Sequence, residues 1–289
     1  EVDIEEELAA AGLTGDEMGR VTILEAAEAR RSLALLSAAR FGYPASKMIT
    51  IGVTGTKGKT TTTHMIKAIL EAAGKKVGMI GTTGTVINGQ VTPTMNTTPE
   101  SYELHQSFAK MAEAGGQYMI MEVSSQGIKM HRVDGLAFDY GIFTNISPDH
   151  IGPDEHADFA EYLCCKARLL SRCRVGRVNL NDGHVKESVK NASCRLYTYR
   201  VKEDGETKAD FEASNVRYVS RPDFVGTEFD VKGRYEMAVR LGIPGLFNVD
   251  NALAAVSICS FLDLSKERIS HAMEPVRVNG RVEIVHTSH

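Results

Sequence analysis

The fold is decided by one stretch of the sequence, Gly52-Val53-Thr54-Gly55-Thr56-Lys57-Gly58-Lys59-Thr60-Thr61. The stretch overlaps the end of an apolar, β-branched run at 48–53, which predicts a buried strand, and helical periodicity follows over 59–73. Glycines in such a turn let backbone N–H groups face phosphate oxygens, and the start of the next helix adds a positive dipole. Because strand, loop and helix come in the order that a phosphate-binding loop requires, we predict such a loop here.

The loop also predicts individual contacts with a nucleotide. We expect Lys59 to reach the β- and γ-phosphates and the Thr60 hydroxyl to bind Mg²⁺. The usual pattern has a glycine five residues before Gly58, where this chain has Val53, so the loop is a shorter variant. The alternative is a glycine- and threonine-rich turn that carries a surface lysine. The candidate nucleotide-binding residues of the loop are Gly55, Thr56, Lys57, Gly58, Lys59, Thr60 and Thr61.

Strands alternate with helices over residues 48–190, which predicts an α/β fold with a mostly parallel central sheet flanked by helices. A hairpin is expected over 83–91, because Asn88-Gly89 supplies the two positive-φ positions of a tight turn. Further strands are expected at 77–80, 118–123, 138–143 and 177–180, and further helices at 99–114 and 156–171.

Two other regions flank this pattern. Ahead of the loop, apolar positions at helical spacing predict a helix over 23–41, with Leu24, Ala27, Leu33, Leu35 and Leu36 among them. After Arg195 the pattern changes to short strands with turns, which suggests a small antiparallel sub-sheet at 197–199, 215–219, 227–231 and 235–241. Helical periodicity returns at 248–261 and 264–273.

Composition excludes several classes of protein. The 289 residues carry a formal net charge of −4, from 33 basic and 37 acidic residues, which argues against general affinity for nucleic acid or membrane surfaces. No run of about 18 apolar residues could span a bilayer, and residues 1–7 carry no apolar signal core. The five cysteines fit neither a disulfide framework nor a zinc pattern. We therefore expect a cytoplasmic protein with reduced thiols. We also expect a monomer.

Two motifs place polar groups at the ends of expected strands. In Asn96-Thr97-Thr98-Pro99, two hydroxyls at a helix N-terminus could cradle an anion or a sugar phosphate; the alternative is a plain N-cap with proline in the first turn. In Glu122-Val123-Ser124-Ser125-Gln126, a carboxylate at the carboxyl end of a parallel strand could bind Mg²⁺; the alternative is a solvated glutamate.

Four further residues are candidates for catalysis or binding. His150 follows another strand end and could bind a metal or a phosphate, although a lone histidine is more often structural. Lys166 lies in an apolar helical stretch, where a lysine usually extends its ammonium group to the surface. Asn248 and Asn251 are one turn apart, so their amides could face the edge of a base together, unless Asn248 only caps the helix.

The shorter loop, Gly-Thr-Lys-Gly-Lys-Thr-Thr after Ile-Gly-Val-Thr, resembles the ATP loop of the Mur ligases and of their folylpolyglutamate synthetase relatives. The resemblance extends over five ordered motifs across residues 48–285, ending at Gly280-Arg281-Val282-Glu283. Some positions differ from the family pattern. Met130 stands where a glutamine is usual, Pro148 stands where many members have arginine, and residues 152–156 replace a usual Asp-Tyr-His-Gly stretch.

The resemblance implies a role for each candidate residue. It implies that Thr60 and Glu122 hold one Mg²⁺, and that His150 and a carbamylated Lys166 hold a second. It places Arg281 at the nucleotide phosphate or ribose and counts Lys59, Lys166, His150 and Arg281 as catalytic. The adenine would be held by Asn248 and Asn251, and the UDP-muramyl substrate by Asn96, Thr97, Thr98, Ser124 and Arg132.

The implied activity is that of an ATP-dependent amide-forming ligase of peptidoglycan precursor synthesis. The match is best to the tripeptide-forming members, which add a free amino acid to UDP-MurNAc-L-Ala-D-Glu. In that reaction a carboxylate attacks the γ-phosphate of ATP to give an acyl phosphate, and an amine then displaces phosphate. The positive charges of Lys59, Arg281 and two Mg²⁺ ions would neutralise the charge that develops on the γ-phosphoryl group.

Two alternatives remain open at this point. One is a ligase resembling folylpolyglutamate synthetase, and the other is an ATP-binding module that is inactive without a further domain. We expect residues 1–46 to be a remnant of an N-terminal UDP-substrate domain with its connecting helix. We expect residues 47–285 to form the central ATP-binding domain, and residues 286–289 to start a missing C-terminal domain.

Overall fold

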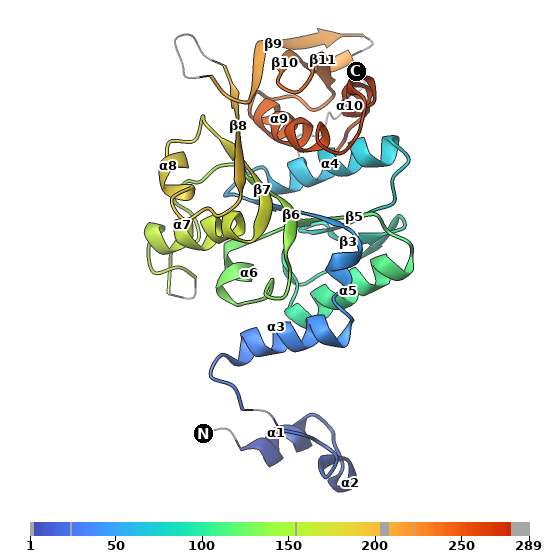
Figure 1. Ribbon diagram of the computed structural model, residues 1–289, viewed down its shortest axis with the longest axis vertical. Coiled ribbons are helices and arrows are strands. Elements are labelled where there is room, and N and C mark those ends of the chain that lie inside the picture. The colour runs from blue at the N-terminus through green and yellow to red at the C-terminus, as the bar shows by residue number, and fades with distance from the viewer. Residues whose placement is uncertain (1–2, 24, 154, 203–207, 223, 279–289) are drawn as a thin grey trace, which may run out of the picture.

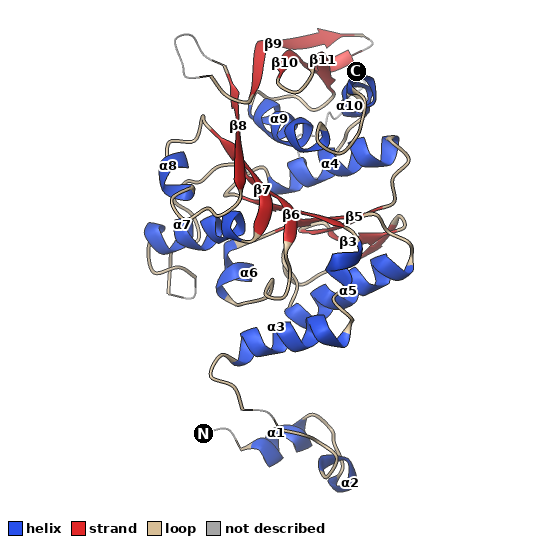
Figure 2. Cartoon of the chain, in the orientation of Figure 1, coloured by secondary structure: helices blue, strands red, loops and turns tan. Residues whose placement is uncertain are grey.

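One mixed sheet runs through the computed structural model, which describes residues 3–23, 25–153, 155–202, 208–222 and 224–278 (Figures 1 and 2). Across the described residues the strand order is β11-β10-β9-β8-β7-β6-β1-β5-β2-β3-β4. The strands are β1 (Ile49–Thr54), β2 (Val77–Gly81), β3 (Gly84–Ile87), β4 (Gln90–Thr92), β5 (Tyr118–Glu122), β6 (Phe138–Phe143), β7 (Cys173–Asn179), β8 (Arg195–Val201), β9 (Phe211–Arg221), β10 (Phe224–Lys232) and β11 (Glu236–Leu241).

Helices cover both faces of this sheet, as the central α/β pattern predicts. In Figure 1, α4, α9 and α10 lie on one face and α5, α6 and α7 on the other. The helices are α1 (Ile4–Ala10), α2 (Gly15–Met18), α3 (Ala29–Arg40), α4 (Lys59–Ala72), α5 (Ser101–Glu113), α6 (Ser125–Lys129), α7 (Phe159–Ala167), α8 (Val185–Ser188), α9 (Phe247–Cys259) and α10 (Lys266–Met273), with 3₁₀ turns η1 (Pro44–Lys47) and η2 (Arg168–Ser171). No helix of the described part of the chain is long and apolar enough to cross a membrane.

The parallel centre of the sheet brings distant loops together. Strand β1 pairs in parallel with β5 on one side and with β6 on the other, and β5 pairs in parallel with β2. The carboxyl ends of these strands therefore meet at one edge, where the loops after Thr54, Glu122 and Phe143 become neighbours. Strand β6 has the predicted bounds, and the hairpin of β3 and β4 turns at Asn88-Gly89, as predicted.

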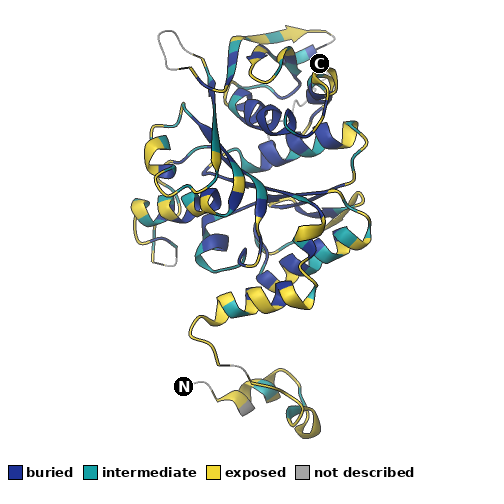
Figure 3. Ribbon diagram, in the orientation of Figure 1, coloured by how far each residue is buried: buried dark blue, intermediate teal, exposed yellow. Residues whose placement is uncertain are grey.

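Two hydrophobic cores lie on the two faces of the sheet. Ile51 and Val53 belong to the core that includes residues of α4 and α9. In Figure 3 most of α9 is dark blue, the colour of buried residues. Between Ile51 and Val53, Gly52 faces the other core, where a side chain would meet Phe138 and Leu169 at 3.0–3.1 Å. A strand buried on both faces explains why residues 48–53 read as a continuous apolar run.

The expectation of a separate antiparallel sub-sheet is only partly right. Strands β9, β10 and β11 are antiparallel to one another. However, β8 pairs in parallel with both β7 and β9, so the antiparallel strands extend the central sheet. Strand β8 is seven residues long, longer than the expected 197–199, and Tyr199 and Arg200 are buried in it. This length lets β8 pair with β7 on one side and with β9 on the other, which makes the sheet continuous.

The N-terminal helix is shorter than predicted and packs through different residues. It begins at Ala29, and its buried residues are Ala34, Ser37 and Ala38, since these small side chains let α3 approach α5 closely. Leu33, Leu35 and Leu36 are about half exposed, and Leu24 lies outside the described residues. Helices α1 and α2 precede it, where no helix was predicted, and lie apart from the sheet (Figure 1).

Candidate active site at the carboxyl edge of the sheet

The predicted phosphate loop joins β1 to α4 and is held by the loop that follows β6. The Thr56 N–H donates to the carbonyl of Asn145 at 2.9 Å, and the Lys57 N–H donates to Oδ1 of the same residue at 2.9 Å. Gly58 has a φ of +86° and immediately precedes α4. A side chain there would collide with the Asn251 amide. The loop therefore has the conformation and the helix N-terminus that an anion site needs.

Two lysines converge on one carbonyl oxygen of this loop. Lys59 Nζ donates to the Gly55 oxygen at 2.8 Å, and Lys166 Nζ donates to the same oxygen at 2.9 Å. Lys166 is only 2% exposed, so it is not a surface lysine. Burial, with a smaller effect of the Lys59 charge, lowers the pKa of Lys166 to about 7. A large fraction of this amine is therefore neutral near physiological pH.

Glu122 lies at the end of β5 and faces the first turn of α4. Its carboxylate accepts from the Thr60 hydroxyl at 3.0 and 3.1 Å and from the Thr82 N–H at 2.9 Å. Glu122 is 1% exposed, which excludes a solvated glutamate. Hydroxyl and carboxylate oxygens are the donors that Mg²⁺ prefers, so the pair fits such an ion. Thr82 was missed, although it follows β2, the parallel neighbour of β5.

Thr98 connects the expected substrate motif to the same strand end. Its hydroxyl donates to the Glu122 carbonyl at 3.0 Å and accepts from the Ser124 N–H at 2.9 Å. Arg132 Nη1 donates to the Thr98 carbonyl at 3.2 Å, and the Ser124 hydroxyl caps α6 by accepting from a backbone N–H at 2.9 Å. The Thr97 hydroxyl lies 3.1 Å from that of Thr82.

The expected helix start in this motif is wrong. Helix α5 begins at Ser101 with Glu100 as its N-cap, two residues later than predicted. Thr98 therefore lies before the helix and does not cap it. Its hydroxyl instead donates to the carbonyl of Glu122 at the end of β5. Asn96 is partly exposed in the loop that follows β4.

His150 lies near this site, but among the described residues it forms no hydrogen bond with Glu122 or Lys166. It has a φ of +54°, and its Nδ1 lies 2.8 Å from Glu155 Oε1. Its ring centroid is 6.0 Å from that of Tyr162, whose ring lies 4.6 Å from Lys166 Nζ. The Tyr162 hydroxyl lies 3.1 Å from the Thr56 hydroxyl. Tyr162 was missed, although it lies one turn before Lys166 on α7.

A cavity of about 240 Å³ opens beside the loop. Asn251 Nδ2 donates to Asn248 Oδ1 at 3.1 Å, so the two expected carboxamides do meet. Asn248 is not the N-cap, because α9 begins at Phe247 and the Asn248 amide donates to the carbonyl of Pro244 at 2.8 Å. The cavity is lined by residues that include Gly58, Asn145, Asp182, Phe247, Asp250 and Asn251.

Asp250 and Phe247 are cavity residues that the sequence interpretation missed. Burial raises the pKa of the Asp250 carboxyl group, which accepts from Asn179 Nδ2 at 3.2 Å. Phe247 is 62% exposed at the cavity, where an aromatic ring can stack on a planar ligand. Arg281, the other expected nucleotide contact, lies outside the described residues.

Comparison with known proteins identifies relatives of this chain. The family profile described as the Mur ligase middle domain matches residues 53–259. A UDP-N-acetylmuramoyl-L-alanyl-D-glutamate–2,6-diaminopimelate ligase of Caldanaerobacter subterraneus is 37% identical over 269 residues, covering 92% of this chain and 54% of the relative. A UDP-N-acetylmuramyl-tripeptide synthetase of Bifidobacterium longum is 36% identical over 265 residues, covering 89% and 50%. The chain therefore spans about half the length of these relatives.

Solved structures share the fold at lower sequence identity. A UDP-N-acetylmuramoyl-L-alanyl-D-glutamate–2,6-diaminopimelate ligase superposes with a TM-score of 0.78 at 24% identity, covering 92% of this chain and 56% of that one. A folylpolyglutamate synthase of Mycobacterium tuberculosis, solved with ADP and AMPPCP, superposes with a TM-score of 0.70 at 18% identity, covering 89% and 64%. At these identities the superpositions support the fold alone.

Proposed function

The chain belongs to the Mur ligase family, and from that premise we propose that it is the ATP-binding centre of an amide-forming ligase of peptidoglycan precursor synthesis. The proposed step adds the third amino acid to UDP-MurNAc-L-Ala-D-Glu. One observation carries the proposal: the phosphate loop presents Thr60 to the buried carboxylate of Glu122 at 3.0 Å, beside two lysines that share the Gly55 carbonyl. This arrangement suits a metal-bound polyphosphate.

We propose two metal positions, and the contact between the Thr60 hydroxyl and the Glu122 carboxylate supports the first of them. Thr60 and Glu122 supply hard oxygen donors for one Mg²⁺. His150 and a carbamylated Lys166 would hold the second. When bound, such ions would neutralise negative charge on the phosphoryl group that is being transferred. Carbamylation adds the Lys166 nitrogen to the carbon of CO₂ and releases one proton, and the pKa of about 7 supports it because it leaves much of the amine neutral.

The chemistry proceeds in two displacements. The carboxylate of the muramyl dipeptide attacks the γ-phosphorus of ATP; an O–P bond forms, and the bond to the ADP oxygen breaks. The amine of the incoming amino acid then attacks the acyl carbon, phosphate leaves with the electron pair of its C–O bond, and a proton passes from the nitrogen to the leaving phosphate. Lys59 exchanges its hydrogen bonds to the carbonyls of Gly55 and Thr56 for phosphate oxygens, which stabilises the transferring group.

Further residues are proposed to bind the two ends of the substrates. The cavity of about 240 Å³ is proposed to hold the adenine, with Asn251 in its lining and the buried Asn248 positioning Asn251 through their hydrogen bond. The loop of Asn96, Thr97 and Thr98, with Ser124 and Arg132, is proposed to bind the UDP-muramyl group. Thr98 supports this assignment because it joins that loop to the end of β5 beside Glu122.

The amine and the domain division are also proposals. Relatives named as 2,6-diaminopimelate ligases support 2,6-diaminopimelate as the amine to test first. We propose residues 47–285 as the ATP-binding domain, preceded by a substrate-domain remnant over 1–46 and followed at 286–289 by the start of an amine-binding domain. Because the chain spans about half the length of its relatives, we expect it to bind ATP without forming an amide by itself.

Calorimetry and a product assay together test the function. We expect ATP to bind when Mg²⁺ is present, and we expect Glu122→Gln to remove the dependence of ATP affinity on Mg²⁺ while the fold is retained.

The product assay supplies ATP, UDP-MurNAc-L-Ala-D-Glu and 2,6-diaminopimelate. A parallel assay supplies ATP, tetrahydropteroate and glutamate. Absence of Mg²⁺-dependent ATP binding would overturn the proposal, and a folyl product would establish the folylpolyglutamate alternative. An amide from the muramyl substrate would refute only the expected inactivity of this chain.

A further inference from the structure

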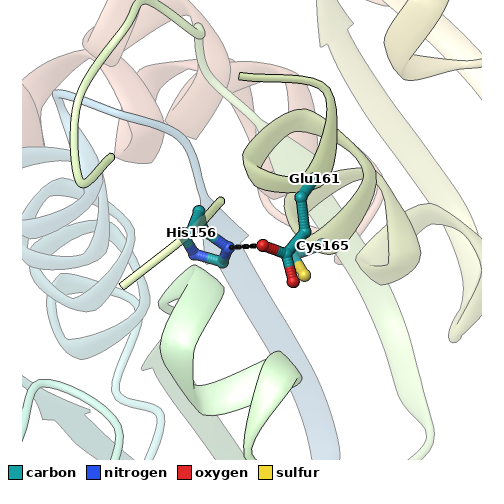
Figure 4. A group of neighbouring side chains, drawn as sticks. All are labelled: His156, Glu161 and Cys165. Atoms are coloured by element: carbon teal, nitrogen blue, oxygen red, sulfur yellow. Dashed lines mark ion pairs between the residues drawn. The ribbon is translucent and has the colours of Figure 1, made fainter. Parts of the chain in front are cut away.

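A second group of candidate metal ligands lies beside α7, outside the residues assigned so far. His156, Glu161 and Cys165 each offer one ligand atom, and these atoms lie within 4.8 Å of one another (Figure 4). Glu161 and Cys165 are one turn apart on α7, whereas His156 precedes the helix. The helix was predicted to begin at His156, but it begins at Phe159 with Asp158 as its N-cap, so His156 belongs to the preceding loop.

His156 provides an independent sign of a ligand. Its side chain is 0% exposed, and neither ring nitrogen has a hydrogen-bond partner within the described parts of the chain. Buried polar atoms nearly always have a hydrogen-bond partner, so two ring nitrogens without one call for an explanation. The Nδ1 atom points toward the Glu161 carboxylate, 3.7 Å away and too far for a hydrogen bond (Figure 4). An ion placed between them would give the Nδ1 atom a partner.

We propose that His156, Glu161 and Cys165 bind a divalent metal ion of the zinc class. Imidazole nitrogen, carboxylate oxygen and thiolate sulfur are the donors that zinc takes, and three protein ligands leave the fourth position to water. On binding, the S–H bond of Cys165 breaks, a bond forms between sulfur and the metal, and the proton passes to the buffer. Spacing rules did not indicate this site, because its only cysteine lies nine residues after its histidine.

A lysine competes with the ion for Glu161. Lys129 Nζ lies 2.9 Å from Glu161 Oε1 and also donates to the carbonyl of Glu155 at 2.7 Å. The ammonium group therefore keeps an acceptor when a metal takes the carboxylate. If Glu161 is a metal ligand, removing the Lys129 ammonium group should raise the affinity for the metal. If Glu161 has only a structural role, the affinity should not depend on Lys129.

The ion would tether the loop that carries His150 to the helix that carries Lys166. His156 forms an isolated parallel bridge with Ile151, and the His156 N–H donates to the carbonyl of His150 at 3.2 Å. Cys165 directly precedes Lys166 in α7. Fixing His156 on α7 would thus fix the backbone of the His150 loop, and this consequence holds whether or not His150 and Lys166 have their proposed roles.

Titration of the metal-free 289-residue chain with Co²⁺ alone tests the site, because a thiolate ligand gives a charge-transfer absorption band. We expect the band at one equivalent, its displacement by Zn²⁺, and its loss in Cys165→Ser. The matched control is Cys164→Ser, which removes the exposed neighbouring thiol and should keep the band. Glu122→Gln should also keep it, which separates this site from the proposed ATP site. No band in the unaltered chain, or a band that survives Cys165→Ser, would overturn the proposal.

Lys129→Met provides a test that leaves all three ligands in place. Without the ammonium group we expect Zn²⁺ to bind several-fold more tightly, as measured against a competing chelator. An unchanged or weaker affinity would show that Glu161 is not a ligand. Zn²⁺ should also raise the Tm of the unaltered chain and not that of Cys165→Ser. Equal shifts in both proteins would contradict the site.

Discussion

The carbonyl oxygen of Gly55 accepts hydrogen bonds from two ammonium groups, those of Lys59 and Lys166. If Lys59 moves to the phosphates when ATP binds, Lys59→Ala should weaken ATP binding. Hydrogen bonds to charged groups contribute about 1.5–3 kcal/mol, so we expect a loss of roughly tenfold to a hundredfold in affinity, measured by calorimetry. Lys67→Ala is the control, since Lys67 lies on the same helix and pairs with Glu71. Equal affinities for the unaltered chain and Lys59→Ala would contradict this assignment.

The lowered pKa of Lys166 predicts a pH dependence of carbamylation. Its pKa falls from 10.5 to about 7, mainly through burial. The neutral, reactive amine therefore increases as the pH rises from about 6 to about 8. With dissolved ¹³CO₂ held constant, the carbamate signal in ¹³C NMR should increase over this interval. Lys166→Arg should lack the signal. A signal that persists in this variant would assign the carbamate to another lysine, and one that is flat with pH would contradict the buried neutral amine.

Among the elements, the start of α4 depends on a backbone conformation that side chains disfavour. Gly58 has a φ of +86°, and a side chain there would collide with the Asn251 amide. Gly74, which follows the same helix, has a φ of +74° with no atom within 4 Å of an added side chain. Gly74→Ala should therefore lower the free energy of unfolding by only about 1–2 kcal/mol and keep ATP binding.

Gly58→Ala should be more destabilising than Gly74→Ala and should also lose ATP binding. The added methyl group brings the same backbone strain, and it also displaces Asn251 from the cavity beside the loop. Urea denaturation and ATP calorimetry on both variants measure the two effects. Equal destabilisation with ATP binding retained in both would show that the collision is relieved without moving the loop.

The elements that the sequence predicts well are those whose run of apolar residues is nearly continuous. Strand β6 has the predicted bounds because it is an uninterrupted apolar stretch apart from Asp139. Strand β7 begins at Cys173, four residues before the predicted 177–180, because Arg174 and Arg177 interrupt its apolar pattern. Arg177 is nevertheless 0% exposed. Its burial depends on rings that are distant in sequence, which a local pattern cannot indicate.

The candidate site shows the same division between local and distant information. The phosphate loop and Glu122 could be predicted, because a strand–loop–helix pattern and parallel strand ends are both visible in the sequence. The contact of Thr82 with Glu122 depends on the pairing of β2 with β5, and the burial of the His156 imidazole beside Glu161 depends on how its loop folds onto α7. Such features follow from tertiary packing between distant segments, and no pattern of residue spacing in the sequence indicates them.

At the scale of the whole molecule, one buried cation joins the ATP-binding centre to the antiparallel extension of the sheet. The guanidinium carbon of Arg177, on β7, lies 4.4 Å from the ring centroid of Tyr197 on β8, 5.7 Å from that of Phe211 on β9 and 4.5 Å from that of Phe261 after α9. Its Nη2 atom donates to the carbonyl of Ser257 in α9 at 3.3 Å. Burial lowers the pKa of Arg177 to about 10, because it disfavours the charged form. The side chain also packs against the surrounding rings.

Arg177→Ala should therefore loosen the junction between the two parts of the sheet. Loss of a large buried side chain with its ring contacts should lower the free energy of unfolding by about 2–4 kcal/mol in urea denaturation. Arg177→Met should cost less, because it keeps most of the volume and removes the penalised charge. The matched control is Arg174→Ala on the same strand, whose side chain is 82% exposed and should contribute no more than about 0.5 kcal/mol. If Arg177→Ala and Arg174→Ala proved equally stable, the extension would be held by its backbone pairing through β8, and the buried cation would not be the joint between the two parts.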